Sequence, residues 1–362
     1  MNPPEPRRVL IATHQALSSS GSDLYTRDLA LALLRRGWQP SVYATALGAV
    51  AEELRQATIP VTNDISAIAV APHVIHGHHH LETLTALARF PGVPALFVCH
   101  DGLTWHSTPP RTRRIGQYIA VDRNCRDRMM LEHGIPESAV RILPNAVDLE
   151  RFRRRPPLPR RPLRALVFSN VATQNLFAST IEAACKQRGI ILDIVGSAAG
   201  TATDHPEEIL SRYDLVFGKA RCALEAAASG TAVIVCDAGG LAGMITTRDL
   251  DAMRQLNFGL RLLRRPITEA AIGAEIDRYD TDDAAKVTDA VRATAGIDLL
   301  AEQFIELYEE LQAGHVPMTP EDELRATAES LSRLSKDVQL ARPVVMSPTE
   351  RLLRRLYRLM KR

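Results

Sequence analysis

The sequence predicts an α/β protein of two halves that face a shared cleft, followed by a helical tail. Buried strands alternate with helices in residues 9–147 and again in residues 165–311. Between them, the segment Arg151–Pro162 holds four prolines and six arginines, a composition that cannot form a core and is typical of an interdomain linker. A chain of 362 residues is also long for one domain, so two domains are expected.

Composition narrows the class of protein. Apolar residues make up 46% and charged residues 24%, as in a soluble globular enzyme, and a net charge of +2 does not indicate nucleic-acid binding. The five cysteines are odd in number and lack a CxxC pair, which predicts reduced thiols. The N-terminus shows no signal-peptide core and no apolar run is long enough to span a bilayer. We therefore expect a cytoplasmic protein.

The first half contains small residues where a ligand could approach. Val9–Thr13 is predicted as a buried strand, and a helix is expected from Asp23 to Arg36. The loop between them includes Ser20 and Gly21, and such a loop is the usual place for a diphosphate or sugar to come close to the backbone. A loop without a ligand is the alternative.

Histidines cluster at the end of the next predicted strand, His73–His78. Alternation places His76, His78 and His80 on one side if the strand persists. A metal site is one interpretation, but no cysteine lies near and Glu82 is the only nearby carboxylate, so we expect no metal. We predict instead polar residues that line a cleft, with His78, His80 and Trp105 on the acceptor side.

A His-Asp pair follows the predicted strand Ala95–Cys99. Both His100 and Asp101 then lie at the edge of the sheet where ligands bind, and we predict them as catalytic residues. A loop-capping pair is the alternative. The half continues with a strand at Tyr118–Val121 and a helix from Arg123 to His133 that Asp122 can cap.

The stretch from Tyr213 to Leu241 organises the second half. It reads as a buried strand to Phe217, a helix over Arg221–Ser229 and a second buried strand over Ala232–Cys236. Short joints between these elements predict a βαβ unit with parallel strands. The carboxyl ends of both strands then lie at one edge, beside Gly218 and the Gly239-Gly240 pair.

The start of this helix suits a phosphate group. Gly218 allows close approach, and Lys219 and Arg221 add positive charge to free N–H groups and the helix dipole. Glu225 lies one turn further on the same face and could accept hydrogen bonds from ribose hydroxyls. The alternative is that the two cations are solvated surface charges and Glu225 only pairs with Arg221.

The C-terminal residues predict a separate helical tail. Thr319-Pro320 forms an N-cap and N1 pair for a polar helix to about Leu340. In the last residues, leucines share one helical face and six basic residues the other, which is the pattern of a helix in an anionic membrane interface. We therefore expect residues 347–362 to bring the protein to the inner face of the membrane, with packing on its own surface or on a partner as the alternative.

Several segments resemble a known family. ILPNAVDLERF (Ile142–Phe152) and ALEAAASGTAVIVCDAGGL (Ala223–Leu241) resemble segments of family-four retaining glycosyltransferases of the GT-B fold, and HVIHGHHH and LFVCHD are similar to segments at their cleft. The resemblance covers roughly Arg8 to Leu311. It implies two Rossmann-like domains: an acceptor-side domain at 1–150, a linker at 151–162 and a nucleotide-sugar domain at 163–315, with the tail at 316–362.

The resemblance also implies an activity. Such enzymes transfer a sugar from a nucleotide-diphosphate sugar with retention, to a glycan, lipid-linked or small-molecule acceptor, without a cofactor or required metal. By resemblance, Glu225 would hold the ribose, Gly239 and Gly240 would line the nucleotide or sugar subsite, and His100 would contact the donor sugar. Asn145 and Asn170 join the predicted donor site.

The sequence departs from the family pattern in three places. Phe217 stands where the first of two glutamates is usual, FSNVATQN offers Asn170 in place of the usual Arg and Lys, and the acidic residue after the glycine pair is missing. A nucleotide-sugar epimerase of the same fold and a catalytically silent binding protein are therefore the alternative functions.

Overall fold

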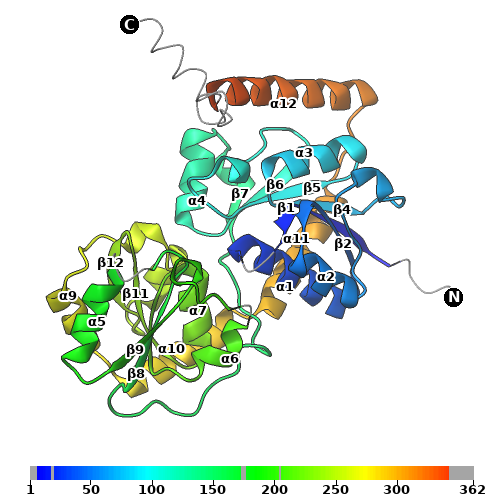
Figure 1. The fold of residues 1–362 in the computed structure, drawn as a ribbon. Coiled ribbons are helices and arrows are strands. Elements are labelled where there is room, and N and C mark those ends of the chain that lie inside the picture. Colours follow the sequence, from blue (N-terminus) through cyan, green and yellow to red (C-terminus); the bar gives the residue numbers. More distant parts are fainter. Residues whose placement is uncertain (1–5, 18–19, 173–176, 204, 342–362) are drawn as a thin grey trace, which may run out of the picture.

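The protein consists of two α/β domains, seen side by side in Figure 1. The computed structural model describes residues 6–17, 20–172, 177–203 and 205–341. The first domain holds a seven-stranded sheet in the order β3-β2-β1-β4-β5-β6-β7, and the second a five-stranded sheet in the order β12-β11-β10-β8-β9. The predicted fold class is confirmed.

The first sheet is parallel throughout. Its strands are β1 (Arg8–Ala16), β2 (Gln39–Leu47), β3 (Val61–Thr62), β4 (Val74–Gly77), β5 (Ala95–Cys99), β6 (Ile115–Ala120) and β7 (Val140–Ile142). Its helices are α1 (Gly21–Arg35), α2 (Ala49–Gln56), α3 (His80–Arg89) and α4 (Arg123–Asp127), which continues as a π-helix at Arg128–Glu132. Because α-helices cover such a sheet on both faces, its central strands are almost wholly apolar and buried.

The second sheet is parallel except for one hairpin. Its strands are β8 (Arg164–Phe168), β9 (Ile191–Val195), β10 (Leu215–Gly218), β11 (Ala232–Asp237) and β12 (Gly240–Met244), the last antiparallel to β11. Its helices are α5 (Ser179–Lys186), α6 (Pro206–Leu210), α7 (Ala220–Ala228), α8 (Leu250–Gln255), α9 (Glu269–Ile276) and α10 (Thr281–Thr294). The predicted βαβ unit is confirmed as β10–α7–β11, with Leu215 opposite Ala232. Short 3-10 turns lie at Ile65–Ala67, Trp105–Ser107, Glu137–Ala139, Ser197–Ala199 and Leu260–Leu262.

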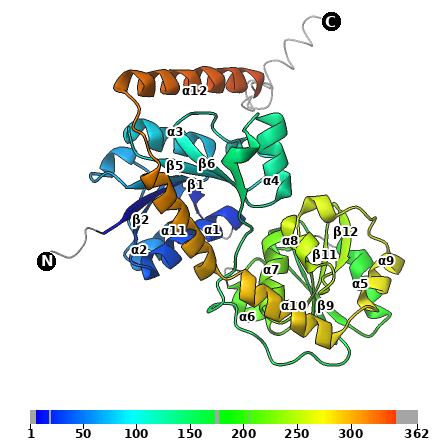
Figure 2. The ribbon, with the colours of Figure 1, turned by 180° about the vertical axis from the view of Figure 1, so that it is seen from behind.

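Helix α11 (Ile297–Ala313) returns the chain to the first domain, as Figure 2 shows. A bridge between Val147 and Gly296 precedes it. Its apolar residues Leu300, Phe304 and Tyr308 recur every four residues, lie on one face and are buried in the core of the first domain. The expected second domain, 163–315, includes this helix, whereas packing assigns it to the first.

Helix α12 (Pro320–Ala341) also belongs to the first domain and lies across α3 (Figure 1). Ala326 and Ser330 are buried against it, and a buried ion pair joins Glu323 to Arg114. The expectation of a separate tail is therefore wrong for this helix, because its polar sequence hides a narrow buried stripe. The amphipathic end, residues 347–362, lies outside the described residues. Within the described residues, no helix has both the length and the apolar character needed to cross a bilayer.

Candidate active site

The candidate site lies where the carboxyl ends of the two sheets approach each other. His100 follows β5 of the first sheet, and Lys219 follows β10 of the second. Ion pairs cross between the domains on two sides, Arg221 with Asp28 of α1 and Arg261 with Asp127 of α4. Helices α1 and α4 accordingly face the second domain in Figure 1.

His100 belongs to a cluster of four aromatic and imidazole rings in the first domain, with Tyr25, His78 and His76. Its ring centroid lies 4.6 Å from that of Tyr25 and 4.7 Å from that of His78, which in turn lies 4.7 Å from His76. The Nδ1 atom of His78 hydrogen-bonds the Thr26 hydroxyl at 3.0 Å. The Nε2 atoms of His76, His78 and His100 and the hydroxyl of Tyr25 are buried with no hydrogen-bond partner among the described residues. Such atoms commonly hold buried water.

Burial keeps these imidazoles neutral. It lowers the pKa of His100 to about 4, with the Asp101 carboxylate opposing the shift. Burial and the neighbouring imidazole of His100 hold the pKa of His76 and of His78 well below the ordinary value. Near neutral pH, His100 therefore acts as a hydrogen-bonding group rather than as a cation.

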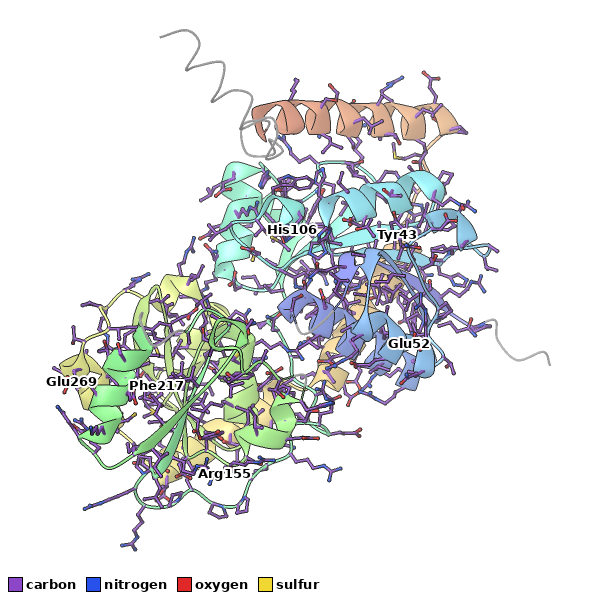
Figure 3. The ribbon with its side chains drawn as sticks, viewed as in Figure 1. Tyr43, Glu52, His106, Arg155, Phe217 and Glu269 are labelled. Carbon is purple, nitrogen blue, oxygen red and sulfur yellow. The ribbon has the colours of Figure 1, made fainter. Side chains whose placement is uncertain are left out.

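A second histidine group lies beside the first. His79 accepts a hydrogen bond from the backbone N–H of His14 on Nδ1 at 2.9 Å, which places its proton on Nε2. His106, labelled in Figure 3 between α3 and α4, stacks on His14 with centroids 5.5 Å apart. Burial lowers the pKa of His79 to about 2. No set of three or more metal-binding side chains among the described residues has an arrangement that could hold a metal ion.

The predicted acceptor-side residues do not form one row. Strand β4 ends at Gly77, so the expected alternation through His80 fails. His80 instead opens α3, and its Nδ1 lies 3.0 Å from the carbonyl oxygen of Thr108. Trp105 remains close, with its ring 6.3 Å from that of His80, and it is about half exposed.

Asp101 has a loop-forming contact. Its Oδ1 accepts the backbone N–H of Leu103 at 2.7 Å, as the capping alternative expects. Its carbonyl oxygen accepts from Arg128 at 2.7 Å. Arg128 also bonds the carbonyl oxygen of Thr104, so it fixes the whole turn after β5.

The other predicted donor residues lie around the same edge. Ser20 caps α1 by accepting the N–H of Asp23, and Gly21 opens that helix. The Oδ1 atom of Asn145 is buried without a hydrogen bond to a described residue. Asn170 is exposed after β8, where its Oδ1 accepts the backbone N–H of Ser197 at 3.2 Å.

Lys219 is part of a chain of polar contacts across three strand ends of the second sheet. Its ammonium group lies 2.5 Å from Oδ2 of Asp237, which is buried at the end of β11. The other oxygen of Asp237 accepts the Ser169 hydroxyl at 2.8 Å, directly after β8. Lys219 itself is half-buried, so its ammonium group stays within reach of a ligand at this edge.

The backbone at the start of α7 is unusual. Ala220 has φ of +50°, a region that is costly for a residue other than glycine. Its N–H donates to the carbonyl oxygen of Phe258, a residue that itself has φ of +49°. Backbone strain of this kind is often found at functional sites. The hydrogen bond from Ala220 to Phe258 holds the segment after α8 against the start of α7.

Glu225 is buried and the side chain of Arg221 is only 12% exposed, so the alternative is wrong in treating Arg221 as a solvated surface charge, whereas the pairing of Glu225 with Arg221 that it expects is present. The Nε atom of Arg221 donates to Oε1 of Glu225 at 2.5 Å, while Nη2 donates to Asp28. Burial raises the pKa of Glu225, and Arg221 partly offsets this. Burial alone would lower the pKa of Arg221, but the two carboxylates outweigh it and hold that pKa above its usual value.

Gly239 lies in the two-residue turn of the β11–β12 hairpin, after Ala238, and Gly240 opens β12 opposite Asp237. Gly240 has φ of +135°, and a Cβ there would lie 2.8 Å from the carbonyl oxygen of Arg265, so only glycine fits. The turn borders a hollow of about 510 Å³ whose lining includes Phe177, Thr180 and Arg264. This hollow is open to a ligand and carries positive charge.

The comparisons with known proteins agree on the architecture. Residues 19–151 match the family model of Glycosyltransferase Family 4. A glycosyltransferase from Rickettsia africae superposes with a TM-score of 0.62 at 14% identity, covering 86% of this chain and 100% of that one. The family model covers part of the first domain, and the superposition shows that both domains share the fold of that glycosyltransferase.

Two further GT-B structures extend the comparison. HepE from Anabaena, solved with UDP and glucose, has a TM-score of 0.61 at 14% identity over 84% of this chain and all of its own. WaaG, a glycosyltransferase of lipopolysaccharide biosynthesis, has a TM-score of 0.52 at 11% identity over 83% of this chain and 99% of its own. No curated protein matches the sequence.

Asp28, Asp237 and Ser169 were not singled out from the sequence, whereas Phe217 was already noted there as a departure from the family pattern. Phe217, at the position of the family's first glutamate, lies fully buried in the second sheet (Figure 3) and cannot reach a ligand. In the sequence, Asp28 is one of several polar residues of the predicted helix. The adjacent Arg27 was the one available sign that Asp28 could be buried in an ion pair. Asp237 and Ser169 gave no signal before the structure joined them to Lys219.

Proposed function

We propose that the protein is a retaining glycosyltransferase that moves a sugar from a nucleotide-diphosphate sugar to a glycan, lipid-linked or small-molecule acceptor. The observation that carries the proposal is the arrangement at the start of α7. A buried carboxylate, Glu225, and a half-buried cation, Lys219, lie beside the carboxyl ends of parallel strands, and the ion pair of Arg221 with Asp28 joins this edge to α1 of the first domain. The similar HepE from Anabaena was solved in complex with UDP and glucose, which supports a nucleotide sugar as donor.

Two side chains divide the donor between them in this proposal. Glu225 accepts hydrogen bonds from the ribose hydroxyls, because an ionised carboxylate is the acceptor that two adjacent hydroxyls prefer. Lys219 binds the diphosphate. Its partner Asp237 already holds the ammonium group at the strand ends, so little side-chain freedom is lost when the diphosphate binds.

The chemical step follows from the leaving group. The acceptor oxygen attacks the anomeric carbon on the face from which the diphosphate departs, and a diphosphate oxygen takes the acceptor proton. The bond between the anomeric carbon and the diphosphate breaks as the new glycosidic bond forms, which retains the configuration. The protein's main task is then to stabilise charge on the diphosphate, a task for Lys219 without a metal ion.

His100 serves the transferred sugar in this scheme. Because its imidazole is neutral near pH 7, it can bond a sugar hydroxyl without adding charge near the reacting centre. Its ring is held by Tyr25 and His78 rather than by mobile loop contacts. Rigid placement of this kind is what positioning in a transition state requires.

Calorimetry tests the proposal directly. UDP, GDP and ADP, and then their sugars, are titrated into the full chain with and without EDTA. We expect one nucleoside diphosphate to bind with Kd on the order of micromolar, unaffected by EDTA. Proton NMR of the product from the matching nucleotide sugar then reports the anomeric configuration. No binding of any of the three nucleotides would contradict the proposal.

A further inference from the structure

One buried carboxylate of the first domain gathers three guanidinium groups. Asp28 on α1 has a side chain that is 1% exposed. It accepts from Arg27 at 3.0 Å and from Arg151 at 3.3 Å, and it also binds Arg221. These arginines come from α1, from the segment that leaves the first domain, and from α7 of the second domain. Asp28 therefore lies at the junction of both domains and their connection.

Arg221 connects this junction to the predicted nucleotide site. Its guanidinium is divided between two carboxylates of different domains, with Nε on Glu225 and Nη2 on Asp28. The guanidinium plane is rigid, so its bond to Asp28 fixes the direction from which Arg221 approaches Glu225. Only Oε1 of Glu225 takes that bond, and Oε2 makes no hydrogen bond within the described part of the chain.

We propose that Asp28 is a positioning residue of the nucleotide site: acting through Arg221, it leaves one oxygen of Glu225 available to the ribose hydroxyls. This inference rests on the proposed function of Glu225 as the ribose acceptor. Ribose recognition, a property of the second domain, then requires the first domain to be docked in the observed orientation.

The reason lies in how a guanidinium pairs. Without the carboxylate of Asp28, Arg221 would be a buried cation with a single partner, and the pairing that satisfies most of its donors is a two-bond fork to both oxygens of Glu225. That fork would occupy the acceptor that the ribose needs. Asp28 prevents this by drawing Nη2 away from Glu225.

The chain supplies a matched control in a second ion pair across the domains. Asp127 of α4 pairs with Arg261 of the segment after α8, and neither residue contacts Arg221 or Glu225. Asp127→Asn removes one carboxylate at the domain boundary, as Asp28→Asn does. It therefore reports any general effect of loosening the two domains.

The experiment measures the preference for ribose. The nucleoside diphosphate that the wild type binds and its 2′,3′-dideoxy analogue are titrated calorimetrically into wild type, Asp28→Asn, Arg221→Gln, their double variant, Glu225→Gln and Asp127→Asn. Thermal unfolding checks that each variant is folded. Should Asp28→Asn fail to fold, Asp28→Ser takes its place, because it also removes the carboxylate that draws Nη2 of Arg221 away from Glu225.

We expect wild type and Asp127→Asn to bind the ribose form at least about tenfold more tightly than the dideoxy form, as for a charged hydrogen bond. Glu225→Gln should lose this preference. Asp28→Asn should lose most of this preference, because Arg221 then occupies both oxygens of Glu225. Arg221→Gln has no guanidinium to form the fork, so it should keep the preference, and the double variant should regain what Asp28→Asn alone loses.

Three outcomes would overturn the inference. A folded Asp28→Asn variant that keeps the full preference shows that Asp28 does not position Glu225, and equal weakening of both nucleotides shows a general structural role. In both cases a preference that still depends on Glu225 leaves the proposed function standing. If the wild type binds no nucleoside diphosphate, or binds one with no preference that Glu225 controls, the proposed function fails and this inference fails with it.

Discussion

Replacing Lys219 removes two contacts of its ammonium group, the one with Asp237 and the one expected with the diphosphate. In Lys219→Met, the buried carboxylate of Asp237 loses a cation 2.5 Å away, and the Ser169 hydroxyl at 2.8 Å is the one side-chain partner it keeps among the described residues. An unpaired buried charge of this kind should lower the free energy of unfolding by about 1–3 kcal/mol. The same change should weaken nucleoside-diphosphate binding by about 1.5–3 kcal/mol, or roughly 10- to 150-fold, the value of a charged hydrogen bond.

A double variant distinguishes the two losses. Lys219→Met with Asp237→Asn replaces the buried carboxylate by a neutral amide, so the free energy of unfolding should return toward the wild-type value. Diphosphate affinity should stay low, because the cation is still missing. Lys286→Met removes an exposed lysine from α10 and serves as the matched control for charge.

Urea unfolding measures the free energy of unfolding, and calorimetry with the nucleoside diphosphate and the parent nucleoside measures binding. The nucleoside, which carries no phosphate, should bind the variants and wild type equally. The reasoning is refuted if Lys219→Met binds the diphosphate as tightly as wild type does, or if the double variant regains affinity together with stability.

Three further predictions concern the histidines and the tail. His100→Ala should lower turnover by about 10²-fold while the melting temperature stays within a few degrees, since an alanine there removes a positioned hydrogen bond; a large loss of stability with normal turnover would show a structural role. Because burial keeps His76, His78, His79 and His100 neutral in the native state, with lowered pKa values, the unfolded chain binds more protons below about pH 6.5. The free energy of unfolding should therefore fall as the pH drops from 6.5 to 5, with a slope approaching about 5 kcal/mol per pH unit by urea unfolding. His78→Asn should reduce that slope by the contribution of roughly one bound proton. A flat profile would show that folding does not keep these imidazoles neutral. Removing residues 347–362 should abolish co-sedimentation with anionic liposomes at low salt but leave nucleotide binding unchanged, and a full-length chain that ignores such liposomes would contradict a membrane role.

Patterns that depend on neighbours in the chain were predicted well from the sequence. The unit β10–α7–β11 follows from apolar runs, a helix rich in alanine and glycines at the joints, all of which are local features. The capping of α4 by Asp122 is confirmed, with its Oδ1 accepting the N–H of Cys125 at 2.7 Å. Boundaries shifted by a few residues, because the ends of strands depend on pairing with neighbours.

Features that depend on residues distant in the chain were not predicted. The return of α11 to the first domain is set by which core accepts Leu300, Phe304 and Tyr308, and the sequence carries no sign of that choice. The place of α12 depends in the same way on one buried ion pair, Arg114 with Glu323, across about 200 positions of the chain.

The candidate site shows the same division. The position of Glu225 and Lys219 at one sheet edge followed from the βαβ pattern and is what the structure contains. Their partners did not follow, because Asp237 and Asp28 reach them through the tertiary fold. Sequence spacing correctly anticipated the bond between Arg221 and Glu225, which lie one helical turn apart. It did not predict that both side chains are shielded from solvent, which strengthens the bond.

A crystal structure with the nucleoside diphosphate that binds tests the central claim most directly. The account predicts the ribose hydroxyls within hydrogen-bond distance of Glu225, the diphosphate beside the Lys219 ammonium group, and its terminal phosphate directed toward His100. A nucleotide bound away from the start of α7, with Glu225 and Lys219 making only the contacts they make now, would contradict it.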